Sequence, residues 1–122
     1  HEQRATRMWV QPPQDILRKI YSACDVLVKL ERRGGFAQAP LEAMACGTPV
    51  ICSDEGGHLD YCLDRFNSLV ASGPAEVSDL IEEIRDDSRL RETLVRNGIA
   101  TAAAFDWERS CRKLDRLLKS RL

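Results

Sequence analysis

The stretch PLEAMACGTPVICSD, residues 40–54, decides how this chain of 122 residues folds. Pro40 stands at the start of an apolar segment and Gly47 directly follows it, which is the proline-early, glycine-late asymmetry of an α-helix. Residues 49–52, PVIC, then have the length and composition of a buried strand. A short helix followed at once by a buried strand predicts an α/β fold with parallel strands.

The segments before and after this stretch continue the alternation. Apolar side chains recur at helical spacing over residues 14–24, and the run VLV, residues 26–28, has the β-branched character of a strand. Parallel strands joined by right-handed crossovers form a doubly wound, Rossmann-like sheet. We therefore expect a three-stranded parallel core near residues 25–28, 49–52 and 68–71.

The C-terminal part of the chain is predicted to consist of helices. One apolar face has the spacing i, i+3, i+4 and i+7, formed by Val77, Leu80, Ile81 and Ile84. A second helical face runs from Leu90 to Phe105, and Asp106 is well placed to cap a separate final helix. Three helices are thus expected to close the chain.

Composition limits the possible classes of function. Hydrophobic residues make up 43% and charged residues 30%, which excludes a disordered polyampholyte and a membrane-spanning protein. The formal net charge of −1 provides no global field for nucleic acid, so no nucleic-acid partner is expected and any anionic ligand must be held locally. Five cysteines without a CxxC pair favour reduced core cysteines and a cytoplasmic location over disulfides or zinc.

The loop of residues 29–39 should lie at the carboxyl edge of the sheet, where α/β proteins bind ligands. Gly34 and Gly35 allow close approach of the backbone, and a helix beginning near Ala39 offers N–H groups to a diphosphate. Glu42 falls in the first turn, where its two oxygens could accept hydrogen bonds from the vicinal hydroxyls of a ribose. Alternatively Glu42 only stabilises the helix N-terminus, and its spacing alone favours that role.

The order of the motifs resembles the C-terminal half of a GT-B glycosyltransferase of the family 4 type, which includes glycogen synthases and mannosyltransferases. The resemblance runs from about Met8 to the C-terminus and is carried by DVLV (25–28), GGF (34–36), PLEAMACGTPVICSD (40–54), EGG (55–57) and FDWERSCRKLDRL (105–117). It implies that residues 1–122 are part of a nucleotide-sugar-binding domain. The acceptor-binding N-terminal domain and the first units of this domain would then lie outside the sequence.

The resemblance also implies a set of donor-binding residues. Glu42 corresponds by position to the second glutamate of the family's E-x7-E motif, which binds the ribose hydroxyls. The implied set comprises Gly35, Phe36, Ala37 and Gln38, whose loop meets the phosphate and sugar, Leu41 beside the nucleoside, and Glu42. No catalytic base is identified, and neither a metal nor another cofactor is expected, because GT-B enzymes generally work without an active-site metal.

The chain departs from the family pattern in the same loop. Gly34 stands where the first glutamate of the motif belongs, Glu31 replaces the usual serine, and Ala37 replaces a glycine. These departures keep an alternative open, a degenerate GT-B module that binds or scaffolds without turnover. A related GT-B sugar-nucleotide epimerase is less favoured, because its signature histidines and acids are not visible.

The expected function is transfer of a sugar from a nucleotide-sugar donor to an acceptor hydroxyl, by a hexosyltransferase-type enzyme of which this segment alone would be inactive. The acceptor would be a glycan, a polysaccharide or a lipid-linked sugar, bound through the missing domain. Peripheral membrane contact is one interpretation of the basic residues on the final helix, and a snorkelling amphipathic face is the favoured one. These residues are Arg109, Arg112, Lys113, Arg116, Lys119 and Arg121.

Three further features have competing interpretations. The acidic and histidine residues after the PVIC strand match no standard metal spacing, so Asp54, Glu55, His58 and Asp60 are not expected to bind a metal. His58 could contact a donor phosphate or the acceptor, although a loop histidine is more often a surface residue, and a surface position is the expectation. The cations Lys29, Arg32 and Arg33 could neutralise a diphosphate or form a solvated loop. The run MWV, residues 8–10, is expected as a strand displaced from the sheet or paired with another chain, because its neighbour would be missing.

Overall fold

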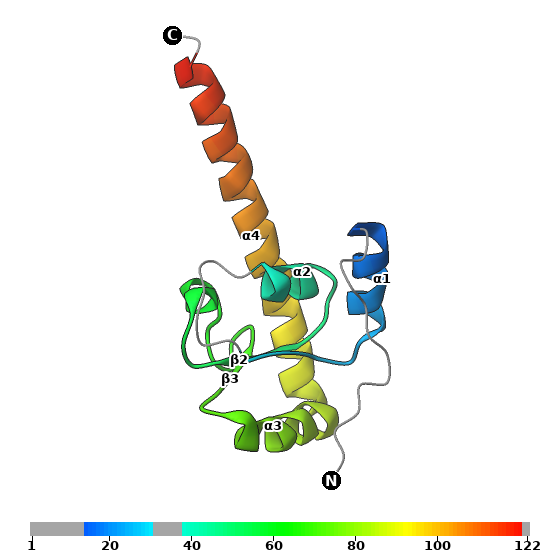
Figure 1. Ribbon diagram of the computed structural model, residues 1–122. Helices are drawn as coiled ribbons and strands as arrows, with labels where there is room; N and C mark the ends of the chain where they lie inside the picture. The colour runs from blue at the N-terminus through cyan, green and yellow to red at the C-terminus, as the bar shows by residue number, and fades with distance from the viewer. Residues whose placement is uncertain (1–13, 31–37, 121–122) are drawn as a thin grey trace.

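The computed structural model describes residues 14–30 and 38–120 of the chain. Helices and strands alternate along it, as the sequence predicts for an α/β fold (Figure 1). In chain order the elements are α1 (Gln14–Ala23), β1 (Leu27–Lys29), α2 (Ala39–Ala45), β2 (Val50–Ser53), the 3₁₀ helix η1 (Gly57–Asp60), β3 (Leu69–Ala71), α3 (Pro74–Asp86) and α4 (Ser88–Ser120).

The three strands form one parallel sheet in the order β1-β2-β3. Ile51 at the centre of the sheet pairs with Val28 on one side and with Leu69 on the other. The predicted parallel core is confirmed, with strand ends within two residues of those expected. The predicted strand at residues 8–10 lies outside the described residues.

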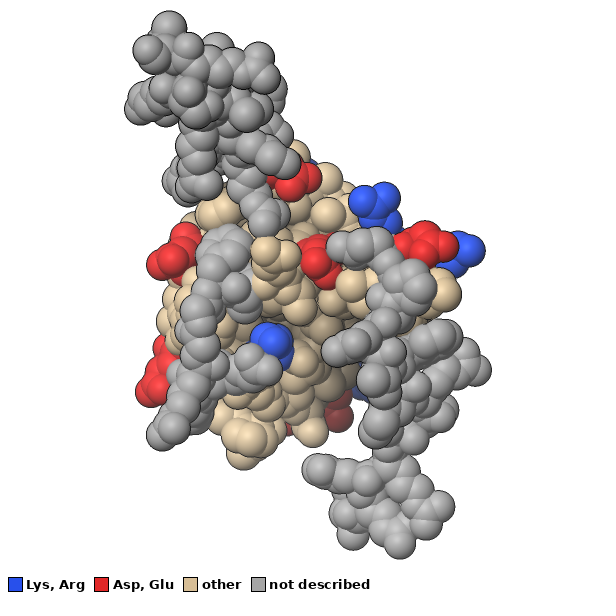
Figure 2. Space-filling model, turned by 45° about the horizontal axis from the view of Figure 1, so that its top comes forward, with Lys and Arg blue, Asp and Glu red and all other residues tan. Residues whose placement is uncertain are grey.

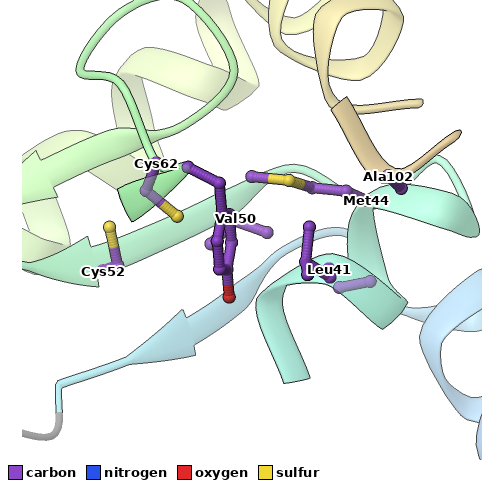
Figure 3. Close-up of a cluster of buried hydrophobic side chains, with 8 residues drawn as sticks. Leu41, Met44, Val50, Cys52, Cys62 and Ala102 are labelled. Atoms are coloured by element: carbon purple, nitrogen blue, oxygen red, sulfur yellow. The ribbon is translucent and has the colours of Figure 1, made fainter. Parts of the chain in front are cut away.

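The core is built on both faces of β2, whose four residues are all buried. Val50 and Cys52 point to one face and Ile51 to the other, because side chains alternate along a strand. The Val50 face packs against Leu41, Met44, Tyr61, Cys62 and Ala102 (Figure 3). The Ile51 face packs against Leu69, Ala71, Ile84 and Leu94. Helix α4 contributes to both clusters and so joins the two sides of the sheet.

Helices α2 and α4 cross closely, and a glycine makes this possible. A Cβ atom added at Gly98 would lie 3.2 Å from the Cγ atom of Met44, tighter than ordinary van der Waals contact. Next to this crossing, the side-chain amide nitrogen of Asn67 donates to the Tyr61 backbone carbonyl at 2.8 Å and to the Thr101 hydroxyl at 2.9 Å. These contacts fix α4 against the loop that leads into β3.

The cysteines differ in their surroundings. Cys52 and Cys62 are buried, and both point into the same core cluster (Figure 3). The neighbouring Cys52 thiol and burial together raise the pKa of Cys62, so its thiol remains protonated at neutral pH. Cys24, however, is exposed, and Cys46 is half-buried. Among the residues whose side chains are described, these four are free thiols, but the expectation of a core position holds only for the first pair.

The C-terminal region differs from its prediction. Residues 88–120 form one helix, and Asp106 lies within it instead of capping a separate one. The physical reason is propensity, since Ala102, Ala103 and Ala104 favour helix and no glycine or proline follows Gly98 to break it. The last part of α4 extends beyond the body of the molecule (Figure 1). None of the helices in the described ranges combines the length and hydropathy required to cross a membrane.

Candidate functional site

The candidate site lies beside α2, which begins at the carboxyl edge of the sheet because it follows β1. Pro40 occupies the first turn of this helix, and Gln38 precedes it with helical backbone angles and no capping bond from its side chain. Leu41 is buried in the core and only 8% exposed, whereas Glu42 is half-buried. The short, proline-started helix thus buries one flank and leaves Glu42 on the other.

A pocket of about 230 Å³ lies along this second flank. It brings together three of the predicted donor-binding residues, Gln38, Leu41 and Glu42. The other three, at positions 35–37, lie outside the described residues. Three helices form the walls: α1 provides Leu17, Arg18 and Tyr21, α2 adds Ala45 and Cys46 at its end, and α4 provides Ala102, Phe105 and Asp106.

Tyr21, in the last turn of α1, lines this pocket together with Glu42. Burial and the neighbouring Glu42 charge raise the pKa of Tyr21, so the phenol is protonated at neutral pH. The hydroxyl of Thr48 donates to the Tyr21 backbone carbonyl. Glu42 therefore lies near a neutral phenol, and its carboxylate oxygens can accept hydrogen bonds from a ligand.

The start of α2 offers fewer free N–H groups than the sequence suggests. Pro40 has none, and the N–H of Glu42 donates to the Gln38 carbonyl at 2.9 Å. A diphosphate site at this helix end therefore cannot rest on the first turn of α2 alone.

The loop after β2 contains a correction. His58 is not a surface residue, since its side chain is 1% exposed and its Nε2 lies 2.7 Å from the Ser53 carbonyl oxygen. The Ser53 hydroxyl donates to the Glu55 carbonyl at 3.0 Å, so this turn is closed by its own polar groups. Gly56 takes a positive φ of 126°, which suits glycine. Across residues 14–30 and 38–106, no three His, Cys, Asp or Glu side chains are grouped to hold a metal ion.

Charge is distributed without a strong local excess on the face shown in Figure 2. There the acidic and basic side chains of the described residues are scattered among neutral ones. Lys29 lies at the end of β1, while the predicted cations at positions 32 and 33 lie outside the described residues. The basic positions 109–121 of the final helix are likewise outside the part whose side chains are described.

Sequence reasoning missed the contributions of α1 and α4 to the pocket. The sequence pattern indicated Tyr21 only as one apolar position of a predicted helix, and Phe105 only as the last position of another helical face. Nothing in the pattern indicated that either would approach Glu42, because Tyr21 and Glu42 are 21 positions apart and meet only through the sheet crossover. A buried tyrosine needs a partner for its hydroxyl, and that general rule is the one available signal.

Comparison with known proteins identifies the chain's family. The model of the family described as glycosyl transferases group 1 matches residues 4–101. The chain belongs to the glycosyl transferases group 1 family. An uncharacterised glycosyltransferase of Methanocaldococcus jannaschii is 35% identical over 88 residues, which are 70% of this chain and 25% of that protein. The D-inositol 3-phosphate glycosyltransferase of Thermomonospora curvata is 31% identical over 109 residues, 88% of this chain and 25% of that protein.

Solved glycosyltransferase structures share the fold. The Anabaena protein HepE, in complex with UDP-glucose, matches with a TM-score of 0.75 at 23% identity, over 85% of this chain and 30% of that one. Sucrose-phosphate synthase from Thermosynechococcus elongatus matches with a TM-score of 0.74 at 30% identity, over 90% of this chain and 28% of that one. The predicted GT-B glycosyltransferase fold is confirmed. The chain spans about a quarter of the length of the curated relatives it matches.

Proposed function

We propose that this chain forms part of the donor site of a glycosyltransferase that transfers a sugar from a nucleotide-sugar donor to an acceptor hydroxyl. The observation that carries the proposal is the half-buried Glu42 carboxylate, which faces a pocket beside a helix at the carboxyl edge of a group 1 glycosyltransferase sheet. A carboxylate so placed can accept hydrogen bonds from both ribose hydroxyls of the nucleotide. The solved HepE complex with UDP-glucose supports a nucleotide sugar as the donor class.

Each described residue of the predicted set has a separate role in this proposal. Glu42 fixes the ribose, and Leu41 forms the apolar base of the pocket next to the nucleoside. Gln38 is exposed at the helix start, where its amide can reach a polar group of the donor. The departing diphosphate would be held by groups beyond the first turn of α2, since Pro40 has no N–H and the N–H of Glu42 is bonded to the Gln38 carbonyl.

The finer assignments belong to the same proposal. Transfer of a hexose to a glycan, polysaccharide or glycolipid, without a metal ion, is the reaction that the family resemblance favours. A cytoplasmic location is proposed from the five cysteines without a CxxC pair, and peripheral contact with a membrane stays the less favoured interpretation of the basic residues on the final helix. Stabilising charge on the leaving diphosphate would be the main contribution of the protein, while the sugar passes through an oxocarbenium-like state.

Isothermal titration calorimetry tests the ribose contact. The complete polypeptide that carries this sequence is titrated with UDP-, GDP- and dTDP-sugars, before and after Glu42→Ala. We expect the dissociation constant of the preferred donor to rise about 10-fold or more, since a hydrogen bond to a charged group contributes about 1.5–3 kcal/mol. Glu92→Ala removes an exposed carboxylate on α4, outside the pocket, and is the matched control.

Equal donor affinity in wild-type and Glu42→Ala proteins would remove Glu42 from the site. Donor binding without turnover of any acceptor would instead favour the degenerate module. Replacing Gly34 with glutamate then tests the departure from the family motif, and a gain in turnover would support degeneracy.

A further inference from the structure

The pocket beside Glu42 is small and has apolar surface on two sides. Its volume of about 230 Å³ is below the roughly 300–1,000 Å³ of most ligand pockets, so it suits the nucleoside end of a donor better than the whole molecule. Leu17 on α1 and Phe105 on α4 provide apolar walls. The Phe105 ring packs edge-to-face against Tyr61, with ring centroids 5.4 Å apart, so this wall has a fixed orientation.

Two charged side chains of opposite sign also line this pocket, on two different helices. Arg18 comes from α1 and is the one cation among the described lining residues, and Asp106 comes from α4. Across residues 14–30 and 38–106, neither side chain is engaged in an ion pair. In addition to Glu42, the pocket thus presents a hydrogen-bond donor and an acceptor that have no described partner of opposite charge.

A nucleobase is the part of a donor that would reach these two side chains. The base is attached to the ribose carbon next to the one that bears the 2′-hydroxyl, so a ribose held at Glu42 leaves the base in the same pocket. Uracil, thymine and guanine carry a carbonyl oxygen beside a ring N–H, whereas cytosine and adenine carry an amino group beside a ring nitrogen without hydrogen. A guanidinium only donates and a carboxylate only accepts, so this pair of side chains matches the first kind of edge and opposes the second.

We propose that Arg18 and Asp106 select the base of the donor, so that the site takes nucleotides of uracil, thymine or guanine and rejects those of cytosine and adenine. The guanidinium of Arg18 donates to the carbonyl oxygen of the base, and the carboxylate of Asp106 accepts from the adjoining ring N–H. This assignment rests on the proposed function, because it concerns the base-binding part of the same donor site, and it adds the class of nucleotide.

Isothermal titration calorimetry of the complete polypeptide with two matched pairs of nucleotides tests this assignment. UDP and CDP differ only at the base edge described above, and IDP and ADP differ at the corresponding edge of a purine. The wild-type protein should bind UDP at least about 10-fold more tightly than CDP, or IDP than ADP if it prefers purines, as expected for one hydrogen bond to a charged group. Arg18→Gln and Asp106→Asn each introduce an amide, which can donate or accept, so each should lower this ratio about 3-fold or more.

The ratio of the two affinities separates base selection from a structural role. If Arg18 or Asp106 only stabilised the pocket, its substitution would weaken both members of a pair alike and preserve the ratio. Lys19→Gln is the matched control for Arg18→Gln, since Lys19 is the neighbouring exposed cation of α1 and does not line the pocket. Glu92→Gln, at an exposed position of α4 outside the pocket, is the control for Asp106→Asn, and both controls should leave the ratio unchanged.

Four results overturn the base assignment while the proposed function stands. They are equal binding of both members of each pair by the wild-type protein, tighter binding of CDP or ADP, a ratio that survives either substitution, and a ratio that falls as far with a control. Failure of the wild-type protein to bind any of the four nucleotides overturns both proposals.

Discussion

The two helices that face each other across the pocket differ in how they are held. Helix α2 buries Pro40, Leu41, Ala43 and Met44, whereas none of the side chains described in α1 is fully buried. The adjacent strands show the same contrast, since every residue of β2 is buried and Val28 in β1 is 38% exposed. Packing fixes α2, whereas α1 contributes the half-buried Tyr21, whose backbone carbonyl accepts a hydrogen bond from Thr48. Glu42 thus belongs to the more deeply buried wall of the pocket.

The largest expected effect is on the free energy of unfolding. It is tested by truncating one apolar side chain in α2 and one in α1. Met44→Ala should lower the free energy of unfolding by about 2–5 kcal/mol, because the side chain is fully buried between β2 and α4. Ile20→Ala, in half-buried α1, should cost roughly 1 kcal/mol, since less apolar area is lost. Urea denaturation of both variants measures the difference. Equal losses would contradict the contrast between the walls.

A smaller effect is expected where α2 ends. Gly47 takes a φ of 76°, a left-handed conformation that costs an alanine about 1–2 kcal/mol. Space is not the cause, because an added Cβ would lie 3.8 Å from its nearest neighbour, on Val95. Gly47→Ala should therefore lower the free energy of unfolding by that amount. The matched control is Gly73→Ala, where the backbone is extended and an added Cβ meets nothing within 4 Å; a loss as large there would refute the conformational explanation.

The smallest effect concerns a surface ion pair on the far side of the sheet from α1. Arg65 and Glu83 form two bonds of 2.8 and 2.9 Å, and hydrogen bonding to Arg65 lowers the pKa of Glu83. A lowered carboxyl pKa stabilises the fold above its ordinary value of about 4.3, and that contribution disappears as the pH falls through the lowered pKa. The Arg65 side chain is 56% exposed and that of Glu83 34%, so solvent screens the pair and Arg65→Ala should cost less than about 0.5 kcal/mol at pH 7.

Denaturation at pH 7 and at pH 3, in low and high salt, measures this small contribution. The difference between wild-type and Arg65→Ala proteins should shrink at the lower pH and in high salt. A difference that stays constant in all four conditions would mean that the arginine acts through packing.

Whether a feature of this structure can be predicted from the sequence depends on how far apart in the chain the interacting residues lie. The strands were predictable because β-branched apolar runs report burial locally, and the position of Glu42 followed from Pro40 and Gly47 at the ends of one short helix. Asp106 was misjudged because a local capping preference was outweighed by the helix-forming alanines before it. The burial of His58 depends on the Ser53 carbonyl that faces it in the folded turn.

The candidate site shows the same limit. A resemblance indicated Gln38, Leu41 and Glu42, and the fold brings these three to one pocket. The position of Tyr21 on the pocket beside Glu42 could not be predicted, because it requires the β1 crossover to place α1 beside α2. Local sequence therefore identified the carboxylate but not the helices that enclose it.

A crystal structure of the complete polypeptide with bound UDP or GDP tests the central claim most directly. We expect the Glu42 carboxylate oxygens at about 2.6–3.0 Å from the 2′- and 3′-hydroxyls of the ribose, as charge-assisted O–H···O bonds require. A nucleotide bound elsewhere, or a ribose whose hydroxyls have no contact with Glu42, would contradict it.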